Sequence, residues 1–176
     1  MSVAQTERRT ADVEVRAKGR RLEGYAALFN HETDLGTFRE AIRAGAFSPS
    51  LRSGRDILAL ADHDPHRVLA RTKSGTLRLS EDSRGLAFDL DIPDTQAGRD
   101  ILALAERGDI GGASFGFVAT DEEWSGQRRE VRALDLHEIS IVQAWPAYQG
   151  TTVTARSRPI LCTSRDLARR YLETIR

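Results

Sequence analysis

Polar and apolar residues alternate along several short stretches of the chain, a pattern that is typical of β-strands with one buried face. Turn-forming Gly, Pro, Asp and Ser residues separate these stretches. The pattern predicts strands over residues 12–16, 21–29, 56–61, 67–72, 76–80, 86–92, 111–119 and 133–143. It also predicts a solvated strand or loop over residues 124–132. Strands that recur every ~8–12 residues favour an antiparallel meander or barrel.

Helical periodicity is clearest over residues 95–107, where apolar residues recur at helical spacing and Gly108 follows as a stop signal. A short helix is predicted from Ser48 to about Ser53, because the proline after Ser48 suits the first helical turn. The tail predicts an amphipathic helix over residues 165–175. The expected fold class is therefore a β-rich α+β protein, mostly antiparallel, with helices packed outside the strands.

Length and charge narrow the class of protein. The 176 residues suit one domain with tails, and we expect a flexible N-terminal arm at 1–10, a folded domain at 11–156 and a helical C-terminal tail at 157–176. Lys plus Arg and Asp plus Glu both number 26, so the formal net charge is +0 and we expect no specific nucleic-acid binding. The single Cys162 excludes an internal disulfide. Since the sequence has neither an apolar run of ~18 residues nor a signal-peptide pattern, we expect an intracellular protein without a membrane partner.

The first candidate for chemistry lies in the Gly-rich sequence GGASFGF, which begins at Gly111. In a strand, its two Phe side chains point to one face, and Gly112, Ser114 and Gly116 point to the other. The face with Ser114 has little side-chain bulk, so another backbone could approach the hydroxyl closely, as a nucleophile requires. The alternative is that the glycines fit a crowded strand and Ser114 is an ordinary small residue.

The second candidate is the sequence ADHDPH at residues 61–66, a proline turn that directly follows an apolar strand. His63 could act as a general base, because imidazole titrates near neutral pH, and it lies nearer the strand end than His66. Two alternatives stay open, a solvated turn and a metal site made of both histidines and an aspartate. We expect no metal, since the His-x-x-His pair spans a proline turn and not one helix face.

The third candidate is the acidic residue of LHEISIV. Glu138 has mostly apolar neighbours, and a partly buried carboxylate needs a partner. A hydrogen bond from a histidine ring would satisfy the carboxylate and fix the tautomer of the ring. The alternative is an edge-strand residue that faces water. His137 points to the opposite face of a regular strand, so only one of the two can face the site. Together the three candidates supply a nucleophile, a base and an orienting group, although sequence spacing does not show that they meet.

Short motifs in a fixed order resemble the tailed-phage prohead (capsid maturation) serine protease family over roughly residues 11–156. The motifs are GYA and FN within 24–30, GAF at 45–47, DHD at 62–64, VLART at 68–72, GTL at 75–77, GL at 85–86, PDT at 93–95, RGDI at 107–110, SFGF at 114–117, EISIV at 138–142 and PAY at 146–148. The resemblance implies the fold of the herpesvirus capsid protease, assemblin: a small, mostly antiparallel β-barrel surrounded by helices.

The resemblance also implies a serine endopeptidase that needs no metal or organic cofactor. Carried over onto this chain, Ser114 is the nucleophile, His63 is the general base and Glu138 is the third member. His137 is the alternative third member, because the herpesvirus relatives have a histidine in that role. Residues 11–156 then form the protease domain.

The oxyanion formed during catalysis needs backbone N–H donors. We expect Ala147 to supply one, because it lies in the turn that follows the Glu138 strand and the preceding Pro146 has no N–H. An extended substrate peptide is expected along a strand edge, held by main-chain bonds. Gly112 and Gly116 would leave room for it.

The expected partners, again implied by the resemblance, are the major capsid protein, a scaffold segment, or both, inside the immature capsid in the cytoplasm of a bacterial host. Self-association as a homodimer or larger oligomer is expected as well. The exposed tails could be cleaved by the protein itself. The alternatives are a non-enzymatic capsid assembly or scaffold-binding module on the same fold, and a metal-dependent hydrolase centred on His63 and His66.

Overall fold

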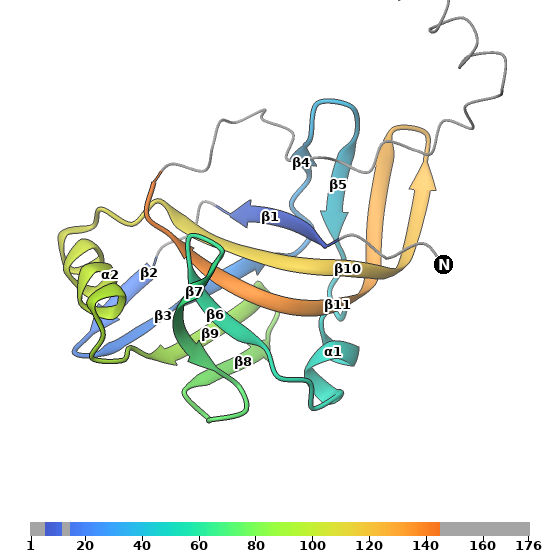
Figure 1. Cartoon of the computed structure of the whole chain (residues 1–176). Coiled ribbons are helices and arrows are strands. Elements are labelled where there is room, and N and C mark those ends of the chain that lie inside the picture. Colours follow the sequence, from blue (N-terminus) through green and yellow to red (C-terminus); the bar gives the residue numbers. More distant parts are fainter. Residues whose placement is uncertain (1–5, 12–14, 145–176) are drawn as a thin grey trace, which may run out of the picture.

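The strands of the protein form two separate sheets in a computed structural model that describes residues 6–11 and 15–144 (Figure 1). The larger sheet has seven strands, in the order β1-β10-β11-β5-β4, and β6 pairs with β11 and with β7. Its strands are β1 (Glu7–Ala11), β4 (Thr33–Asp34), β5 (Arg39–Ile42), β6 (Leu58–Ala61), β7 (Asp64–Arg71), β10 (Gly112–Ser125) and β11 (Arg128–Val142). The smaller sheet has the order β2-β3-β9-β8, with β2 (Val15–Lys18), β3 (Arg21–Leu28), β8 (Leu77–Glu81) and β9 (Gly85–Asp91).

The β-rich, mostly antiparallel character expected from the sequence is confirmed. Two pairings are parallel, and both involve β11, which lies beside β5 along its first residues and beside β6 near its end. The closed barrel is not confirmed, because each sheet pairs only within itself among the described strands. The two sheets are held together by side-chain packing. The alternating polarity of the sequence predicts strands with one buried face, and that pattern is the same whether two sheets pack together or close into a barrel through hydrogen bonds.

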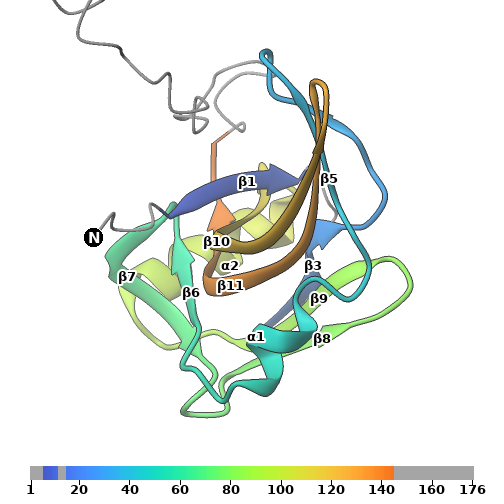
Figure 2. The ribbon, with the colours of Figure 1, turned by 90° about the vertical axis from the view of Figure 1, so that its right-hand side faces the viewer.

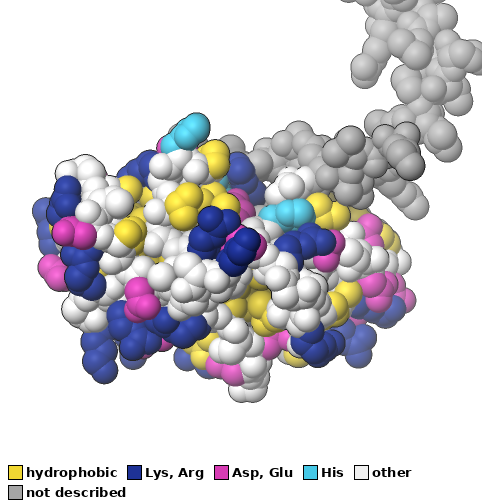
Figure 3. Space-filling model, turned by 60° about the horizontal axis from the view of Figure 1, so that its bottom comes forward, with side chains coloured by type: hydrophobic (Ala, Val, Ile, Leu, Met, Phe, Trp, Pro, Cys, Tyr) yellow, Lys and Arg dark blue, Asp and Glu magenta, His cyan; other side chains and the backbone are white. Residues whose placement is uncertain are grey.

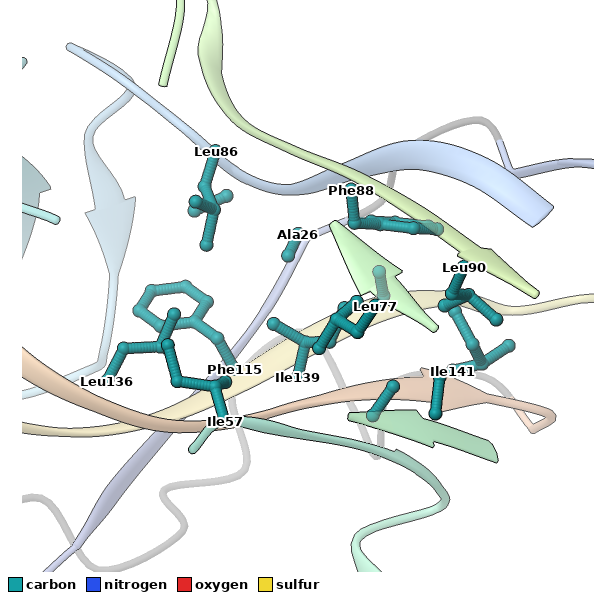
Figure 4. Close-up of a cluster of buried hydrophobic side chains, with 14 of the residues drawn as sticks. Ala26, Ile57, Leu77, Leu86, Phe88, Leu90, Phe115, Leu136, Ile139 and Ile141 are labelled. Atoms are coloured by element: carbon teal, nitrogen blue, oxygen red, sulfur yellow. The ribbon is translucent and has the colours of Figure 1, made fainter. Parts of the chain in front are cut away.

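Apolar side chains from both sheets meet in one core (Figure 4). Phe115 and Phe117 of β10 are buried there with Ile139 and Ile141 of β11, and Leu86 of β9 packs from the other sheet. The predicted orientation of the two Phe side chains is therefore correct. Because alternate residues of a strand point to opposite faces, the burial of these residues turns Ser114 and Gly116 away from the core.

Two helices are present among the described residues. Helix α2 (Gln96–Arg107) agrees with the predicted 95–107, because the Thr95 hydroxyl caps it by accepting the Gly98 N–H at 3.2 Å, and Gly108 ends it with a positive φ of 74°. The short helix is α1 (Ser48–Arg52), as expected from its proline. Neither helix is long and apolar enough to cross a membrane.

The N-terminal segment differs from its prediction. Residues 1–10 were expected to form a flexible arm, but Glu7–Ala11 form strand β1, which pairs along β10 on the side away from β11 (Figure 2). Residues 124–132, predicted as a solvated strand or loop, comprise the end of β10, a turn at 126–127 and the first residues of β11. The predicted tail helix at 165–175 lies outside the described residues.

The charged residues of the surface are interspersed by sign. On the face shown in Figure 3, Lys and Arg side chains lie among Asp and Glu side chains. Ion pairs at the surface account for part of this mixing, such as Arg78 with the half-buried Asp89 at 2.9 Å and Asp91 at 3.0 Å. This distribution fits the balanced composition of the chain.

Candidate active site

Ser114 lies on β10 between two other strands of the larger sheet. Its Cα partner on β11 is Ser140, and its partner on β1 is Thr10. Ser114 has no exposed surface in this arrangement. Side chains directly opposite one another share a face of the sheet, so Ser114 faces the same side as Thr10, Gly116, Glu138 and Ser140.

His63 reaches this face from the turn between β6 and β7. Strand β6 runs parallel to β11 with Ala61 opposite Ile141, so the next residues of the chain emerge beside the Glu138 strand. Asp62 and His63 both have left-handed backbone conformations, with φ of 51° and 60°. This conformation costs a non-glycine residue about 1–2 kcal/mol, so the turn is held by its surroundings. One contact that holds it is the Asp62 N–H, which donates to the Ile141 carbonyl at 3.0 Å.

The imidazole of His63 contacts a buried carboxylate. His63 Nδ1 lies 2.7 Å from Glu138 Oε1, and the Ser140 hydroxyl donates to Oε2 at 3.0 Å. Arg8 adds a third partner, with its Nε 3.4 Å from Oε1. Burial raises the pKa of the Glu138 carboxyl, but these partners, His63 foremost, outweigh it and hold the pKa below its ordinary value of 4.5. Glu138 is therefore a carboxylate at neutral pH.

Gly116 has a different role from the one predicted for it. We expected its missing side chain to leave room for a substrate, but a Cβ at this position would lie 2.8 Å from Glu138 Oε1 and 2.9 Å from Glu138 Cγ. The Glu138 side chain therefore already fills that space. Gly112, the other residue expected in the cleft, begins β10 opposite Val142 with a φ of 148°.

His137 lies apart from this group. The β10–β11 ladder skips it, because Gly116 pairs with Glu138 and Phe117 with Leu136. His137 is exposed, and no hydrogen bond described for the chain joins it to His63. The bulge lets Leu136 enter the core while Glu138 faces the site.

The Ser114 hydroxyl donates a hydrogen bond to the carbonyl oxygen of Arg9 at 2.7 Å. Among the hydrogen bonds of the described residues, none joins Ser114 to His63. The structure thus brings His63 and Glu138 into direct contact and places Ser114 one strand away, with its hydroxyl engaged by β1. We call this the covered arrangement, because β1 pairs along β10 beside Ser114 and leaves the serine with no exposed surface.

Strand β1 is attached to the sheet through a buried ionic cluster, which we define as Glu7, Arg9, Glu40 and Arg129. Arg129 Nη1 lies 2.5 Å from Glu7 Oε2 and 2.7 Å from Glu40 Oε2, and Arg9 Nε lies 2.5 Å from Glu40 Oε1. The side chains of Glu7, Glu40 and Arg129 are at most 6% exposed. Buried charges are stable only when they are paired in this way. Removal of β1 would take Glu7 and Arg9 away from Glu40 and Arg129, so the cluster stabilises β1 on the sheet.

Other predicted residues lie elsewhere. His66 is exposed, and no group of three metal-ligand side chains gathers near it or anywhere in the described part of the chain. Ala147 lies outside the described residues. Two site residues were missed, Ser140 and Arg8. Ser140 could have been found, because it follows Glu138 by two positions and so shares its face, whereas no sequence signal points to Arg8.

A histidine bonded to a buried carboxylate, with a serine on the adjoining strand, is the residue set of the serine hydrolases. The family model described as the caudovirus prohead serine protease matches residues 5–165 of the chain. Because this match spans nearly the whole sequence, the chain belongs to that family, whose members are proteases of phage capsid maturation.

A solved structure shares the fold. It is that of the capsid assembly protease of bacteriophage T4, gp21, which aligns with a TM-score of 0.56 and 10% sequence identity. The alignment covers 80% of this chain and 98% of that chain. No curated protein matches the sequence. At this identity the likeness to gp21 shows the fold, and the family match supports the activity.

Proposed function

We propose that the protein is a serine endopeptidase that cleaves capsid or scaffold protein segments during prohead maturation, with Ser114 as nucleophile. The observation that carries this proposal is the 2.7 Å contact between His63 and Glu138, one strand away from Ser114, in a chain of the prohead protease family. His63 is the general base and Glu138 the third member. The contact favours Glu138 over His137, which is exposed and has no described bond to the ring.

The reaction is peptide hydrolysis through an acyl-enzyme. The Ser114 oxygen attacks the scissile carbonyl carbon while its proton passes to His63 Nε2. His63 then returns that proton to the leaving amine as the C–N bond breaks. Water repeats the sequence to release the acyl group. Glu138 accepts the Nδ1–H bond throughout, which keeps Nε2 free to take the proton and stabilises the imidazolium.

The covered arrangement describes a latent enzyme. A hydroxyl that donates to the Arg9 carbonyl is not available to His63, and β1 occupies the β10 edge where an extended substrate could pair. The protease therefore becomes active when β1 leaves this edge. Because β1 is itself an extended peptide beside Ser114, the N-terminal segment is a substrate for self-processing.

The partners that follow are the major capsid protein or a scaffold segment, inside the immature shell in the host cell. Self-association of the protease belongs to the same proposal. An extended segment of the partner pairs with β10 after β1 departs, through main-chain bonds that need little sequence similarity to β1.

Co-expression with the major capsid protein of the same particle tests the proposal, followed by intact-mass spectrometry of both chains. The variants are wild type, Ser114→Ala and, as a matched control, Ser50→Ala, which removes another buried hydroxyl outside the site. We expect discrete truncation of the capsid protein by wild type and Ser50→Ala, and none by Ser114→Ala.

Three results would contradict parts of the proposal. No truncation by any variant, in shells that contain the protein, favours a non-enzymatic assembly module. Truncation by Ser114→Ala shows that another nucleophile cuts. Truncation of the capsid protein while the N-terminus of the protease stays intact removes the self-processing step alone.

A further inference from the structure

Ser140 stands at the centre of the site without a role in the reaction proposed above. It is fully buried on β11, where its Cα partners are Ser114 on one side and Leu60 of β6 on the other. A buried hydroxyl has one proton to donate and lone pairs to accept with. Both capacities are used here toward candidate catalytic residues.

The donated bond fixes the carboxylate. The Ser140 hydroxyl donates to Glu138 Oε2 at 3.0 Å, while His63 Nδ1 contacts Oε1 at 2.7 Å. With both oxygens engaged, the plane of the carboxylate is defined, and Gly116 lets the side chain lie flat against β10. Without the hydroxyl, Oε2 would lose its only described hydrogen-bond donor in a buried environment.

The accepted bond fixes the base. The backbone N–H of His63 donates to Ser140 Oγ at 3.1 Å. His63 needs such a restraint because it and Asp62 both have left-handed backbones, which favour relaxation of the turn. Asp62 is tied to the residue that directly follows this strand, since its carboxylate accepts the Gln143 N–H at 2.8 Å. Ser140 is the only one of these tethers that also touches Glu138.

We propose that Ser140 is a positioning residue that sets the orientation of His63 and Glu138 relative to each other. This inference rests on the proposed function for its effect on catalysis, but the geometry it describes exists whether or not the protein is active. Through one hydroxyl, the strand that carries Glu138 also places the turn that carries His63. Misplacement by about 1 Å can reduce a rate about 100-fold, so we expect a loss of roughly 10- to 100-fold in the chemical step.

The test compares Ser140→Ala with Ser50→Ala in the full chain. Ser50 is a close match, because it is 1% exposed and its hydroxyl also accepts a backbone N–H of β11, that of Leu136 at 2.9 Å. Both variants lose one buried hydroxyl, so their thermal unfolding should shift similarly. Ser140→Cys is the conservative variant, because a thiol retains a weak donor and acceptor.

Two readouts separate a positioning role from a structural one. The first is the imidazole ¹⁵N and ¹H spectrum of His63, which reports the Nδ1–H tautomer and its hydrogen bond without any need for activity. We expect a single bonded tautomer in wild type and Ser50→Ala, a mixture in Ser140→Ala and partial recovery in Ser140→Cys. The second is the rate at which a fluorophosphonate labels Ser114. This rate should fall 10- to 100-fold in Ser140→Ala, fall less in Ser140→Cys and stay at the wild-type value in Ser50→Ala.

The outcomes distinguish failure of the inference about Ser140 from failure of the proposed protease function. If wild type is labelled and Ser140→Ala matches Ser50→Ala in both the His63 spectrum and the labelling rate, Ser140 is structural and the inference is wrong. If wild type is never labelled and never cleaves a partner, the proposed function fails, and the His63 spectrum still decides whether Ser140 orders the pair. A wild-type-like spectrum in Ser140→Ala overturns the inference in either case.

Discussion

The two faces of strand β1 differ in how they attach to the rest of the protein. On one face, Glu7 and Arg9 enter the buried ionic cluster, where the Arg9 side chain is 10% exposed. On the other face, the Arg8 side chain is 47% exposed and its Nε lies 3.4 Å from Glu138 Oε1. The difference shows that β1 is held mainly by the core side of the sheet, while its backbone covers Ser114. Charge pairing outside the site therefore acts together with the backbone pairing of β1 to β10 in keeping the candidate nucleophile covered.

The largest effect is expected on the site face, from Glu138→Gln. An amide in place of the carboxylate no longer favours the Nδ1–H tautomer of His63, so the rate of Ser114 labelling or substrate cleavage should fall about 10⁴-fold. The fold should persist, because the ionic cluster is untouched. His137→Gln is the control, and a loss of similar size in that variant would return the third-member role to His137.

On the core face, Arg129→Met should lower the free energy of unfolding by about 3–5 kcal/mol, because Glu7 and Glu40 then stay buried with Arg9 as the one arginine left to pair both carboxylates in the cluster. Thermal or denaturant unfolding measures the change. Arg132→Met is the matched control, since the Arg132 side chain is 36% exposed and its removal should have little effect. Equal losses in the two variants would mean that burial does not set the strength of the cluster.

The adjacent arginines of β1 give the sharpest contrast between the two faces. Arg9→Ala should cost at least about 2 kcal/mol more than Arg8→Ala, because Arg9 makes two close hydrogen bonds to the buried Glu40. Arg8 lies 3.4 Å from Glu138, which keeps its closer contacts with His63 and Ser140. For Arg8→Ala the expected change is under about 1 kcal/mol, as for other exposed ion pairs. Unfolding of the two variants under identical conditions measures the difference. A larger loss of stability in Arg8→Ala than in Arg9→Ala would show that β1 is attached mainly through its site face.

Acid should weaken the attachment of β1. Burial raises the pKa of the Glu7 carboxyl, but its bonds and charge interactions with Arg129 and Arg9 outweigh this and hold the pKa below its ordinary value of 4.5. The resulting stabilisation is fully present above pH 4.5 and is lost as the pH falls through the lower pKa of the folded state.

Amide NMR signals of residues 7–11, followed from neutral pH to about pH 3, measure this effect. We expect them to leave their strand positions before the signals of β10 and β11 do, and Glu7→Gln should show a smaller pH dependence. Signals of β1 that move only together with global unfolding would count against a separate attachment.

Local patterns in the sequence predicted much of the fold. Helix α2 was found from its apolar spacing and the Gly108 stop, and both signals depend on near neighbours in the sequence. The alternation of residues between two faces predicted the strand that carries Ser114 and the orientation of its two Phe side chains. Strand β1 was missed for the opposite reason. Its charged residues resemble a solvated tail until their partners are known, and Arg129 lies 122 residues from Glu7 in the chain.

The candidate site shows the same division. The residues alone indicated only that Glu138, a carboxylate among apolar neighbours, needs a partner such as a histidine ring, because a buried charge must be paired. The resemblance to prohead proteases then pointed to Ser114, His63 and Glu138 as one site. Neither source revealed that Ser114 donates to Arg9, that Glu138 fills the space beside Gly116, or that Ser140 contacts both members of the pair.

The sequence by itself determined the types of element, the apolar faces of the central strands and the residue types available for chemistry, since each depends on neighbours within a few positions. Only the tertiary structure decided which strands lie side by side, whether the two sheets close, and what covers Ser114. These depend on contacts between segments that are far apart in the chain. A charge or hydroxyl gives no sign of its distant partner until packing removes the water that would otherwise satisfy it.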